Sequence, residues 1–149
     1  MGTYKLKKGY NIRIVGAPEK TVAQASAPKV VAVDARDFIG STLKLSVKAG
    51  AKVKAGSVLF YDKTNQEIKF TSPVSGEVKE VVRGARRALQ EIVIIPDGQN
   101  NSEDFGTIGS EELLASSREK VLDQILASGS FPFFIQRPYA VIPDPTVVP

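Results

Sequence analysis

The chain contains neither cysteine nor histidine among its 149 residues. The absence of cysteine excludes disulfides, iron–sulfur clusters and thiolate metal sites within these residues. The absence of histidine removes the commonest metal ligand and the commonest general base near neutral pH. Any catalysis here would therefore depend on Asp, Glu, Lys or Tyr side chains, or on a bound cofactor.

Long apolar runs and tryptophan are missing as well. No run approaches the roughly 20 apolar residues that span a bilayer, and the N-terminus lacks the apolar core of a signal peptide. The net charge of +4 comes from basic residues scattered among acids, with one local cluster at Arg83, Arg86 and Arg87. No basic and aromatic run typical of a nucleic-acid platform is present. A connection to a membrane would therefore come through partners, and no nucleic-acid partner is expected.

Residues 45–82 hold the most informative pattern, a doubled turn in which Val47-Lys48-Ala49-Gly50 is followed by Val53-Lys54-Ala55-Gly56. An apolar strand (58–61), a polar hairpin and a second strand into Ser72-Pro73-Val74-Ser75-Gly76 come next. In a flattened barrel of two small sheets, glycine supplies the sharp reversals and the valine before each turn fills the core. This order is typical of the scaffold of biotinyl and lipoyl carriers.

Short strands are predicted on both sides of this motif. Alternation or β-branched composition predicts an edge strand with a turn within residues 4–15, and strands over 29–34, 42–47, 78–82 and 89–95. A connection or short helical turn is expected over 34–38, and Pro96-Asp97-Gly98 is a strong turn signal. The pieces make about seven or eight short strands before residue 97. The expected fold class is mainly β, with a barrel-sandwich hybrid domain over residues 1–98.

The residue that would make this scaffold a carrier is missing. A carrier presents a lysine at the tip of the hairpin before the proline, usually between apolar neighbours. Here the tip falls near Asn65, and Lys63 lies off register between Asp62 and Thr64. Lys63 is therefore expected to be a solvated hairpin lysine, with a biotin- or lipoyl-modified Lys63 kept as the alternative. A membrane-fusion adaptor is a third option, but its long helical hairpin does not fit the short one here.

The composition changes after residue 98. Residues 99–104 are polar and predict a linker or surface loop, and Ser110 and Ser117 resemble N-caps. Val121, Leu122, Ile125 and Leu126 share one helical face, and Gly129 stands where a C-terminal cap belongs. Residues 99–149 are thus expected to be a linker, a helix and the truncated beginning of a second, α/β domain, which makes the chain a fragment.

Several separate motifs together resemble one family. They are Lys7-Lys8-Gly9, the run Ile14 to Glu19, the doubled turn with Val58-Leu59-Phe60, the run Phe70 to Gly76, Arg83-Gly84-x-x-Arg87, Ser128-Gly129, Arg137-Pro138 and Ile142-Pro143. In this order and spacing the chain resembles, nearly end to end, the A subunits of bacterial sodium-translocating NADH:quinone oxidoreductases.

The resemblance implies a longer subunit, of which these residues are the N-terminal third, in a six-subunit membrane complex. That complex is a translocase that passes electrons from NADH through flavins and an iron–sulfur centre to ubiquinone, and exports sodium. The resemblance implies a peripheral subunit on the cytoplasmic face of the inner membrane, near the quinone-reducing membrane subunit. It implies no cofactor in this chain, and flavins and the iron–sulfur centre in partner subunits. The fragment itself is expected to be structural or docking, with no catalytic or metal-binding residue.

Two segments have candidate roles. Related flavin- and NADH-binding subunits carry a glycine-rich loop where this chain has Ser128-Gly129-Ser130-Phe131-Pro132-Phe133-Phe134. Bulky aromatics replace the glycines that let backbone N–H groups approach phosphate, so we expect a degenerate loop that no longer binds FMN or NADH. Core packing is the first interpretation of the aromatic residues in this region, and a quinone contact is the second. The residues are Phe131, Phe133, Phe134 and Tyr139.

The arginine cluster also has two interpretations. Arg83, Arg86 and Arg87 could dock a neighbouring subunit, because arginine is enriched at interfaces. They could equally be the solvated turn of a hairpin.

Overall fold

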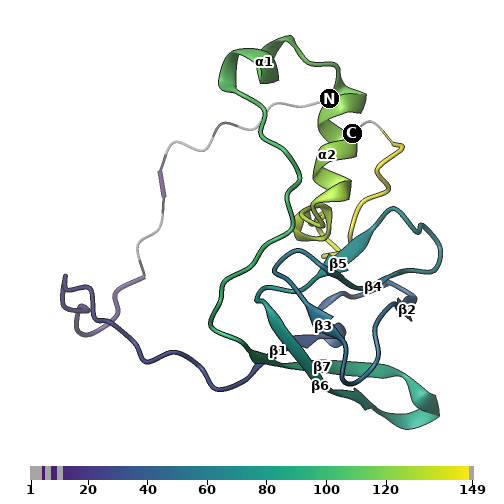
Figure 1. Cartoon of the computed structure of the whole chain (residues 1–149). Coiled ribbons are helices and arrows are strands. Elements are labelled where there is room, and N and C mark those ends of the chain that lie inside the picture. The colour runs from purple at the N-terminus through teal and green to yellow at the C-terminus, as the bar shows by residue number, and fades with distance from the viewer. Residues whose placement is uncertain (1–4, 6–7, 10–11, 148–149) are drawn as a thin grey trace.

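The structure, a computed structural model, describes residues 5, 8–9 and 12–147. In these residues seven strands form two antiparallel sheets that face each other (Figure 1). One sheet has the order β1-β7-β6-β3 and the other β2-β4-β5. The strands are β1 (Val31–Asp34), β2 (Leu43–Leu45), β3 (Lys52–Val53), β4 (Val58–Asp62), β5 (Lys69–Thr71), β6 (Gly76–Arg83) and β7 (Leu89–Pro96). The mainly β barrel-sandwich fold is confirmed.

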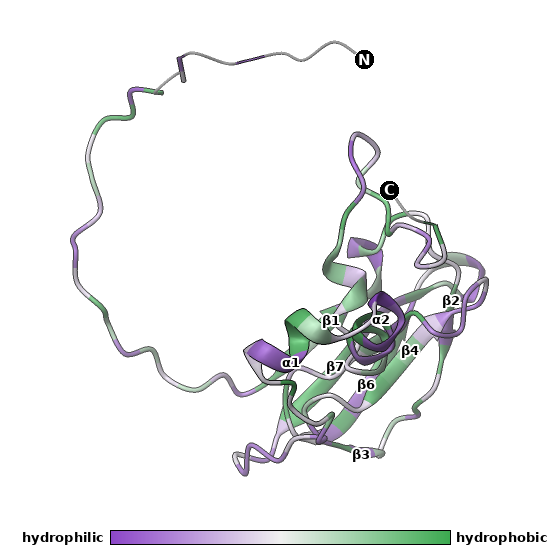
Figure 2. Ribbon diagram, turned by 90° about the horizontal axis from the view of Figure 1, so that it is seen from above, coloured by the Kyte–Doolittle hydropathy of each residue, from purple (hydrophilic) through white to green (hydrophobic). Residues whose placement is uncertain are grey.

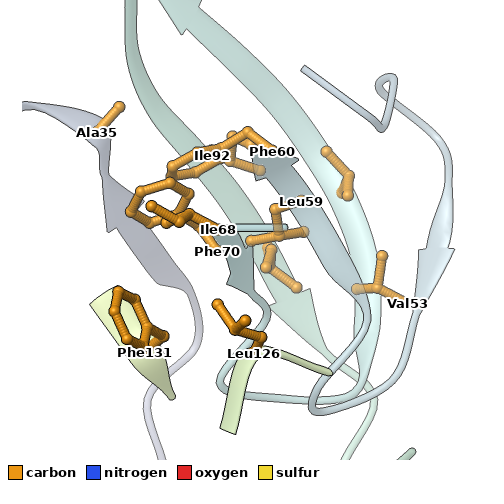
Figure 3. Close-up of a cluster of buried hydrophobic side chains, with 11 residues drawn as sticks. Ala35, Val53, Leu59, Phe60, Ile68, Phe70, Ile92, Leu126 and Phe131 are labelled. Atoms are coloured by element: carbon orange, nitrogen blue, oxygen red, sulfur yellow. The ribbon is translucent and has the colours of Figure 1, made fainter. Parts of the chain in front are cut away.

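The core lies between the two sheets (Figure 3). Ile92 and Ile94 of β7 point inward at alternate positions, as a strand with one buried face requires. They belong to the same buried cluster as Phe60 of β4, whose ring stacks on that of Phe70 in β5 at 4.8 Å between centroids. Hydrophobic residues are concentrated in the strands (green in Figure 2). The apolar positions that alternate with polar ones in the sequence are those whose side chains face the core.

Strand β4 breaks the alternation. Leu59 and Phe60 are consecutive, yet both are completely buried. The register with β5 shifts between Val58 and Phe60, which leaves Leu59 as the extra residue of a β-bulge. A bulge reorients one side chain relative to its neighbours, and here it allows two adjacent residues to fill the same core.

The residues after β7 form two helices, α1 (Ser110–Ala115) and α2 (Arg118–Ala127), and the 3₁₀ turn η3 (Phe131–Phe133). Helix α2 stands on the side of the sheets where β5 lies (Figure 1), and η3, which follows it, contacts β5. Leu126 at its end and Phe131 in η3 are buried in the same hydrophobic cluster as the strand residues. The C-terminal segment therefore contributes directly to the core of the sandwich.

The helix ends follow the sequence signals with one correction. Ser117 caps α2, since its side chain accepts a hydrogen bond from the Lys120 N–H. Gly129 ends α2 in a Schellman arrangement, in which its N–H and that of Ser130 donate to Leu126 and Ile125. The expected N-cap role of Ser110 is wrong by one position. Gly109 adopts the extended N-cap conformation and Ser110 is already helical.

Residues 12–30, before β1, run away from both sheets (Figures 1 and 2). The strand expected within residues 4–15 is wrong for residues 12–15, which pair with no strand of the described chain and are exposed. Residues 4, 6–7 and 10–11 of that expectation lie outside the described residues. A β-branched segment becomes a strand only beside a partner edge. The 3₁₀ turn η1 (Ala35–Asp37) confirms the helical turn expected after β1.

Candidate functional site

Backbone hydrogen bonds join the doubled turn to β6 and to the Ser-Pro-Val-Ser-Gly segment that precedes it. Gly50 and Gly56 have φ values of 81° and 91°, which favour glycine. The Gly50 N–H donates to the Val78 carbonyl at 2.8 Å, and the Gly56 N–H donates to the Ser72 carbonyl at 2.8 Å. Both glycines of the motif therefore pair with backbone more than a dozen residues later in the chain, which is a structural role for its spacing.

The polar segment after β7 is fastened to the second of these turns. The Ala55 N–H donates to the Asn101 carbonyl, and the Glu103 N–H donates to the Ala55 carbonyl, which makes a short parallel bridge. The Ser57 hydroxyl donates to the Glu103 carboxylate at 2.8 Å. Phe105 then covers Gly56, where a Cβ would lie 2.8 Å from the ring. Residues 101–105 thus hold the helical segment against the sandwich.

A buried serine fixes the turn after β7. Ser75 is buried, and its hydroxyl donates to an Asp97 carboxylate oxygen at 2.6 Å while accepting from the Asn101 N–H. The Ser75 hydroxyl, followed by the Gln99 backbone N–H, holds the pKa of Asp97 below its ordinary value. The carboxylate here orders a turn, and a depressed pKa is the opposite of what a general acid needs.

The β4–β5 hairpin has no carrier-type lysine tip. Asp62 accepts from the Thr64 N–H and Asn65 accepts from the Glu67 N–H, so two side chains close the turn. Lys63 is exposed, and its own N–H donates to the Thr42 carbonyl. This geometry matches the solvated hairpin lysine expected from the sequence. Modification of Lys63 stays a prediction that the intact mass would test.

The loop after α2 uses its backbone donors internally. Besides Gly129 and Ser130 at the helix end, the Phe133 and Phe134 N–H groups donate to the carbonyls of Ser130 and Phe131. Gly129 lies against Thr71 of β5, where a Cβ would be 2.4 Å from the threonine methyl. Backbone N–H groups that cradle phosphate must point to the ligand. In this loop four such donors are already bonded within the chain.

The four aromatic quinone candidates fall into two groups. Phe131 is buried in the core, whereas Phe133, Phe134 and Tyr139 are exposed. Phe133 borders a cleft of about 240 Å³ between β1, β5 and η3, smaller than the roughly 300–1,000 Å³ of most ligand pockets. The quinone contact stays a prediction, and among these residues only the three exposed rings have free surface for it.

The three arginines lie together at the exposed turn between β6 and β7. Arg86 and Arg87 follow each other with φ values of 54° and 61°, in the left-handed region. The Arg83 side chain donates to the Arg87 carbonyl at 3.1 Å, which ties the turn across its base. Such a conformation costs roughly 1–2 kcal/mol for each non-glycine residue. The fold therefore holds the backbone of Arg86 and Arg87 in an unfavourable conformation, and this energetic cost must be offset elsewhere in the structure.

Metal-binding clusters and membrane-spanning helices are both absent from the described residues. These residues contain no group of three or more carboxylates, histidines or cysteines arranged to hold a metal ion. No helix among them is both long and apolar enough to traverse a lipid bilayer.

Comparison with known proteins identifies the scaffold. Residues 4–97 match the family model described as the NqrA N-terminal barrel-sandwich hybrid domain. The matched range ends one residue beyond β7.

Similar curated proteins cover nearly all of this chain. A protein from Marinomonas sp. (strain MWYL1) is 40% identical over 146 residues, which are 98% of this chain and 33% of that protein. One from Hahella chejuensis is 39% identical over 93% of this chain and 31% of its own length. One from Pseudomonas aeruginosa is 37% identical over 97% and 32%. Each is named as the A subunit of a Na(+)-translocating NADH-quinone reductase. The chain spans about a third of the length of these relatives.

Proposed function

Since the chain belongs to the family of NqrA N-terminal barrel-sandwich hybrid domains, we propose that it is the positioning domain of a subunit of a sodium-translocating NADH–quinone reductase. The observation that carries the proposal is the identity of 37–40% to subunits of that name, over 93–98% of this chain. The complex reduces ubiquinone with electrons from NADH and exports sodium. The subunit supplies part of its architecture.

A positioning role agrees with the chemistry of the described residues. The motif glycines and the Ser75–Asp97 pair are used to fasten turns, and the carboxylate is held in its ionised form. The charged residues with the most constrained backbone are Arg86 and Arg87 at an exposed turn. Strained backbone concentrates at functional sites, and arginine is enriched at interfaces. We therefore propose that Arg83, Arg86 and Arg87 dock a neighbouring subunit.

The remaining features of the complex follow as parts of the same proposal. The neighbours are other subunits of the reductase, above all its quinone-reducing membrane subunit. Flavins and the iron–sulfur centre are in those partners, and this subunit binds peripherally at the cytoplasmic face of the inner membrane. The absence of cysteine in these 149 residues agrees with an iron–sulfur centre held elsewhere.

The loop after α2 is proposed not to bind FMN or NADH. Four of its backbone N–H groups are bonded within the chain, and Phe131 fills the space toward the core. Isothermal titration of the full-length subunit with FMN and with NADH tests this. Saturable binding of either that is lost on replacing Phe133 and Phe134 would contradict the proposal.

Assembly tests the proposed function directly. The full-length subunit is tagged and expressed with its neighbours, and membranes are assayed for co-purified subunits and for sodium-stimulated NADH oxidation with ubiquinone. Replacing Arg83, Arg86 and Arg87 by Glu should release the subunit, because like-charge contacts replace attractive ones. Lys63→Glu is the matched control at another exposed hairpin. If the wild-type subunit copurifies with no reductase component, the function is wrong. If the wild type and the triple variant both assemble normally, only the arginine role is wrong.

A further inference from the structure

Exposed aromatic side chains are concentrated in one short segment. Of the four exposed aromatic residues in the described part of the chain, three lie within residues 133–139, and the fourth is Phe105, which covers Gly56. The exposed fractions are 76% for Phe133, 53% for Phe134 and 79% for Tyr139. With Ile135, which is also exposed, these side chains form what we call the aromatic ridge (Phe133, Phe134, Ile135 and Tyr139).

The ridge is held by an anchored backbone on both sides. Phe131 and Pro132 are buried before it, and the Phe134 N–H donates to the Phe131 carbonyl at 3.0 Å. After Ile135 the chain makes a small hairpin whose base is the 2.8 Å hydrogen bond from the Gln136 N–H to the Val141 carbonyl. Ile142 then packs against the core. The exposed rings therefore project from hydrogen-bonded backbone, so little backbone freedom remains to be lost on binding.

Such a surface has the composition of an interface. Clustered exposed apolar side chains mark interaction sites, and aromatic residues and arginine are the side chains most enriched at interface centres. Arg137 lies within the same segment and is exposed. The neighbouring cleft, with Phe38, Phe70 and Phe133 in its wall, offers about 240 Å³ for an apolar side chain of the partner. Asp34 and Asp37 also line the cleft, whose surface is otherwise mainly apolar. Exposed aromatic side chains beside such a cleft fit another folded protein surface better than a flexible polar ligand.

The lengths of the relatives indicate which protein surface covers the ridge. They carry about two thirds of their length outside the part that matches this chain, since the match covers 31–33% of each. The family model is named for an N-terminal domain and matches residues 4–97, so the additional sequence follows the matched part. The ridge lies in the last matched residues, and elements close in sequence are usually neighbours in space.

We infer that the aromatic ridge is the surface on which the following domain of the full-length subunit docks. The ridge and its cleft would be covered by residues of the same polypeptide, which fixes the sandwich relative to the rest of the subunit. This inference depends on family membership and not on the proposed function of the complex.

The absence of cysteine from this chain allows a direct test. Phe134→Cys and Tyr139→Cys are made singly in the 149-residue chain and in the full-length polypeptide, and the rate of maleimide labelling is measured at that site by peptide mass spectrometry. Lys63→Cys, at the exposed β4–β5 hairpin, is the matched control. Thermal unfolding of the shorter chain should be unchanged by Tyr139→Cys and only slightly lowered by Phe134→Cys, because the centroid of the Phe134 ring lies 5.8 Å from that of Phe131.

Covering of the ridge predicts labelling about tenfold or more slower in the full-length polypeptide than in the shorter chain at positions 134 and 139, because only a minor open state would react. Position 63 should label equally fast in both. Equal rates at the ridge positions in the two polypeptides, or a gene product that ends at residue 149, would overturn the inference. It is also overturned if labelling slows with concentration of the shorter chain, which would indicate a second copy, or slows only when ubiquinone-1 is added, which would indicate a quinone contact.

Discussion

Gly129 is constrained both by its own backbone and by a neighbouring strand. Its φ of 71° lies in the left-handed region, and a Cβ there would be 2.4 Å from the Thr71 methyl and 2.9 Å from its hydroxyl. Gly98 has almost the same φ, 70°, but nothing lies within 4 Å of its absent side chain. Substitutions at the two glycines therefore distinguish the cost of backbone strain, which both share, from the cost of disturbing the contact with β5, which only Gly129 has.

We predict that Gly129→Ala costs clearly more stability than Gly98→Ala. Each should lose about 1–2 kcal/mol for the left-handed conformation, and Gly129→Ala should lose about 1–3 kcal/mol more because Thr71 must move. Urea unfolding followed by circular dichroism measures both. Equal losses of stability would mean that Thr71 of β5 moves away from the new methyl group at position 129 without an energetic cost.

Asp97 gives the fold a pH dependence at the acid end. Its pKa lies below the ordinary 3.8 in the folded state, first through the hydrogen bond from Ser75. A carboxyl whose folded pKa is depressed contributes stability above its unfolded pKa and loses it as the pH falls through the folded pKa. Stability should therefore decline below about pH 4.

The matching variants are Asp97→Asn and Ser75→Ala. Asp97→Asn should flatten the part of the acid decline that Asp97 causes, and Ser75→Ala should raise the Asp97 pKa in a carbon-13 carboxyl titration by NMR. An unchanged Asp97 titration in Ser75→Ala would show that the hydroxyl has no influence on the carboxylate.

At the scale of elements, helix α2 connects the C-terminal segment to the sheets. Its first turn is closed by the Ser117 side chain, and its last turn brings Leu126 into the core. Ser110, at the start of α1, occupies the first helical position instead of the cap. Two serines that look alike in the sequence thus differ in what they bond.

Ser117→Ala should destabilise the protein by about 1 kcal/mol, because one first-turn N–H loses its acceptor. Ser110→Ala should change stability by less than about 0.5 kcal/mol, as an exposed helical position does. Thermal unfolding of the two variants compares them. A loss for Ser110→Ala that equals the loss for Ser117→Ala would contradict the capping assignment, because alanine has a higher helix propensity than serine.

The local patterns of the strands were sufficient to predict most of these elements. Alternation around Leu43 and Leu45, the apolar run of β4 and the turn at Pro96 each gave the right element near its observed bounds. The strand expected near Ile12 failed because pairing depends on a partner edge, which no local pattern contains. The bulge at Leu59 and the glycine cap of α1 also depend on tertiary context.

For the candidate site, the sequence predicted which types of side chain are present but not which of them are buried or hydrogen-bonded. The off-register position of Lys63 could be counted from the sequence, and its exposure agrees. The burial of Phe131 beside the exposure of Phe133 could not be predicted, since both belong to one aromatic and proline-rich run. The bridge between Ala55 and Ser102 was equally hidden, because it joins a turn to a polar segment that has the composition of a linker. Backbone hydrogen bonds of this kind do not require particular side chains, so the sequence contains no pattern that predicts them.

At the scale of the whole molecule, the residues on both sides of position 98 share one hydrophobic cluster. Leu126 and Phe131 come from the C-terminal segment and lie in the same core as Phe60 and Phe70. The backbone bridge at residues 101–103 adds a second connection. We therefore expect residues 31–147 to unfold as one cooperative unit.

Phe131→Ala should lower the stability of the entire unit by about 3–5 kcal/mol, as expected for a buried phenylalanine. Phe133→Ala, two residues later and exposed, should change it by less than about 0.5 kcal/mol. Far-ultraviolet circular dichroism and tyrosine fluorescence should give coincident urea transitions for the wild type and for Phe131→Ala. Two separate transitions would divide the chain into independent parts.

The closed hairpin between β4 and β5 has a use in protein engineering. Asp62 and Asn65 shape its turn, while Lys63 and Thr64 project into solvent on the scaffold of a carrier protein. Replacing Thr64, Asn65 and Gln66 by Met, Lys and Met would move a lysine to the tip and leave the buried Asp62 in place, while the hydrogen bond from the Glu67 N–H to the Asn65 side chain would be lost. Incubation with a biotin ligase and ATP would then show whether shape and a short recognition sequence suffice for attachment. A positive result would supply a site-specific handle for immobilising the protein on streptavidin.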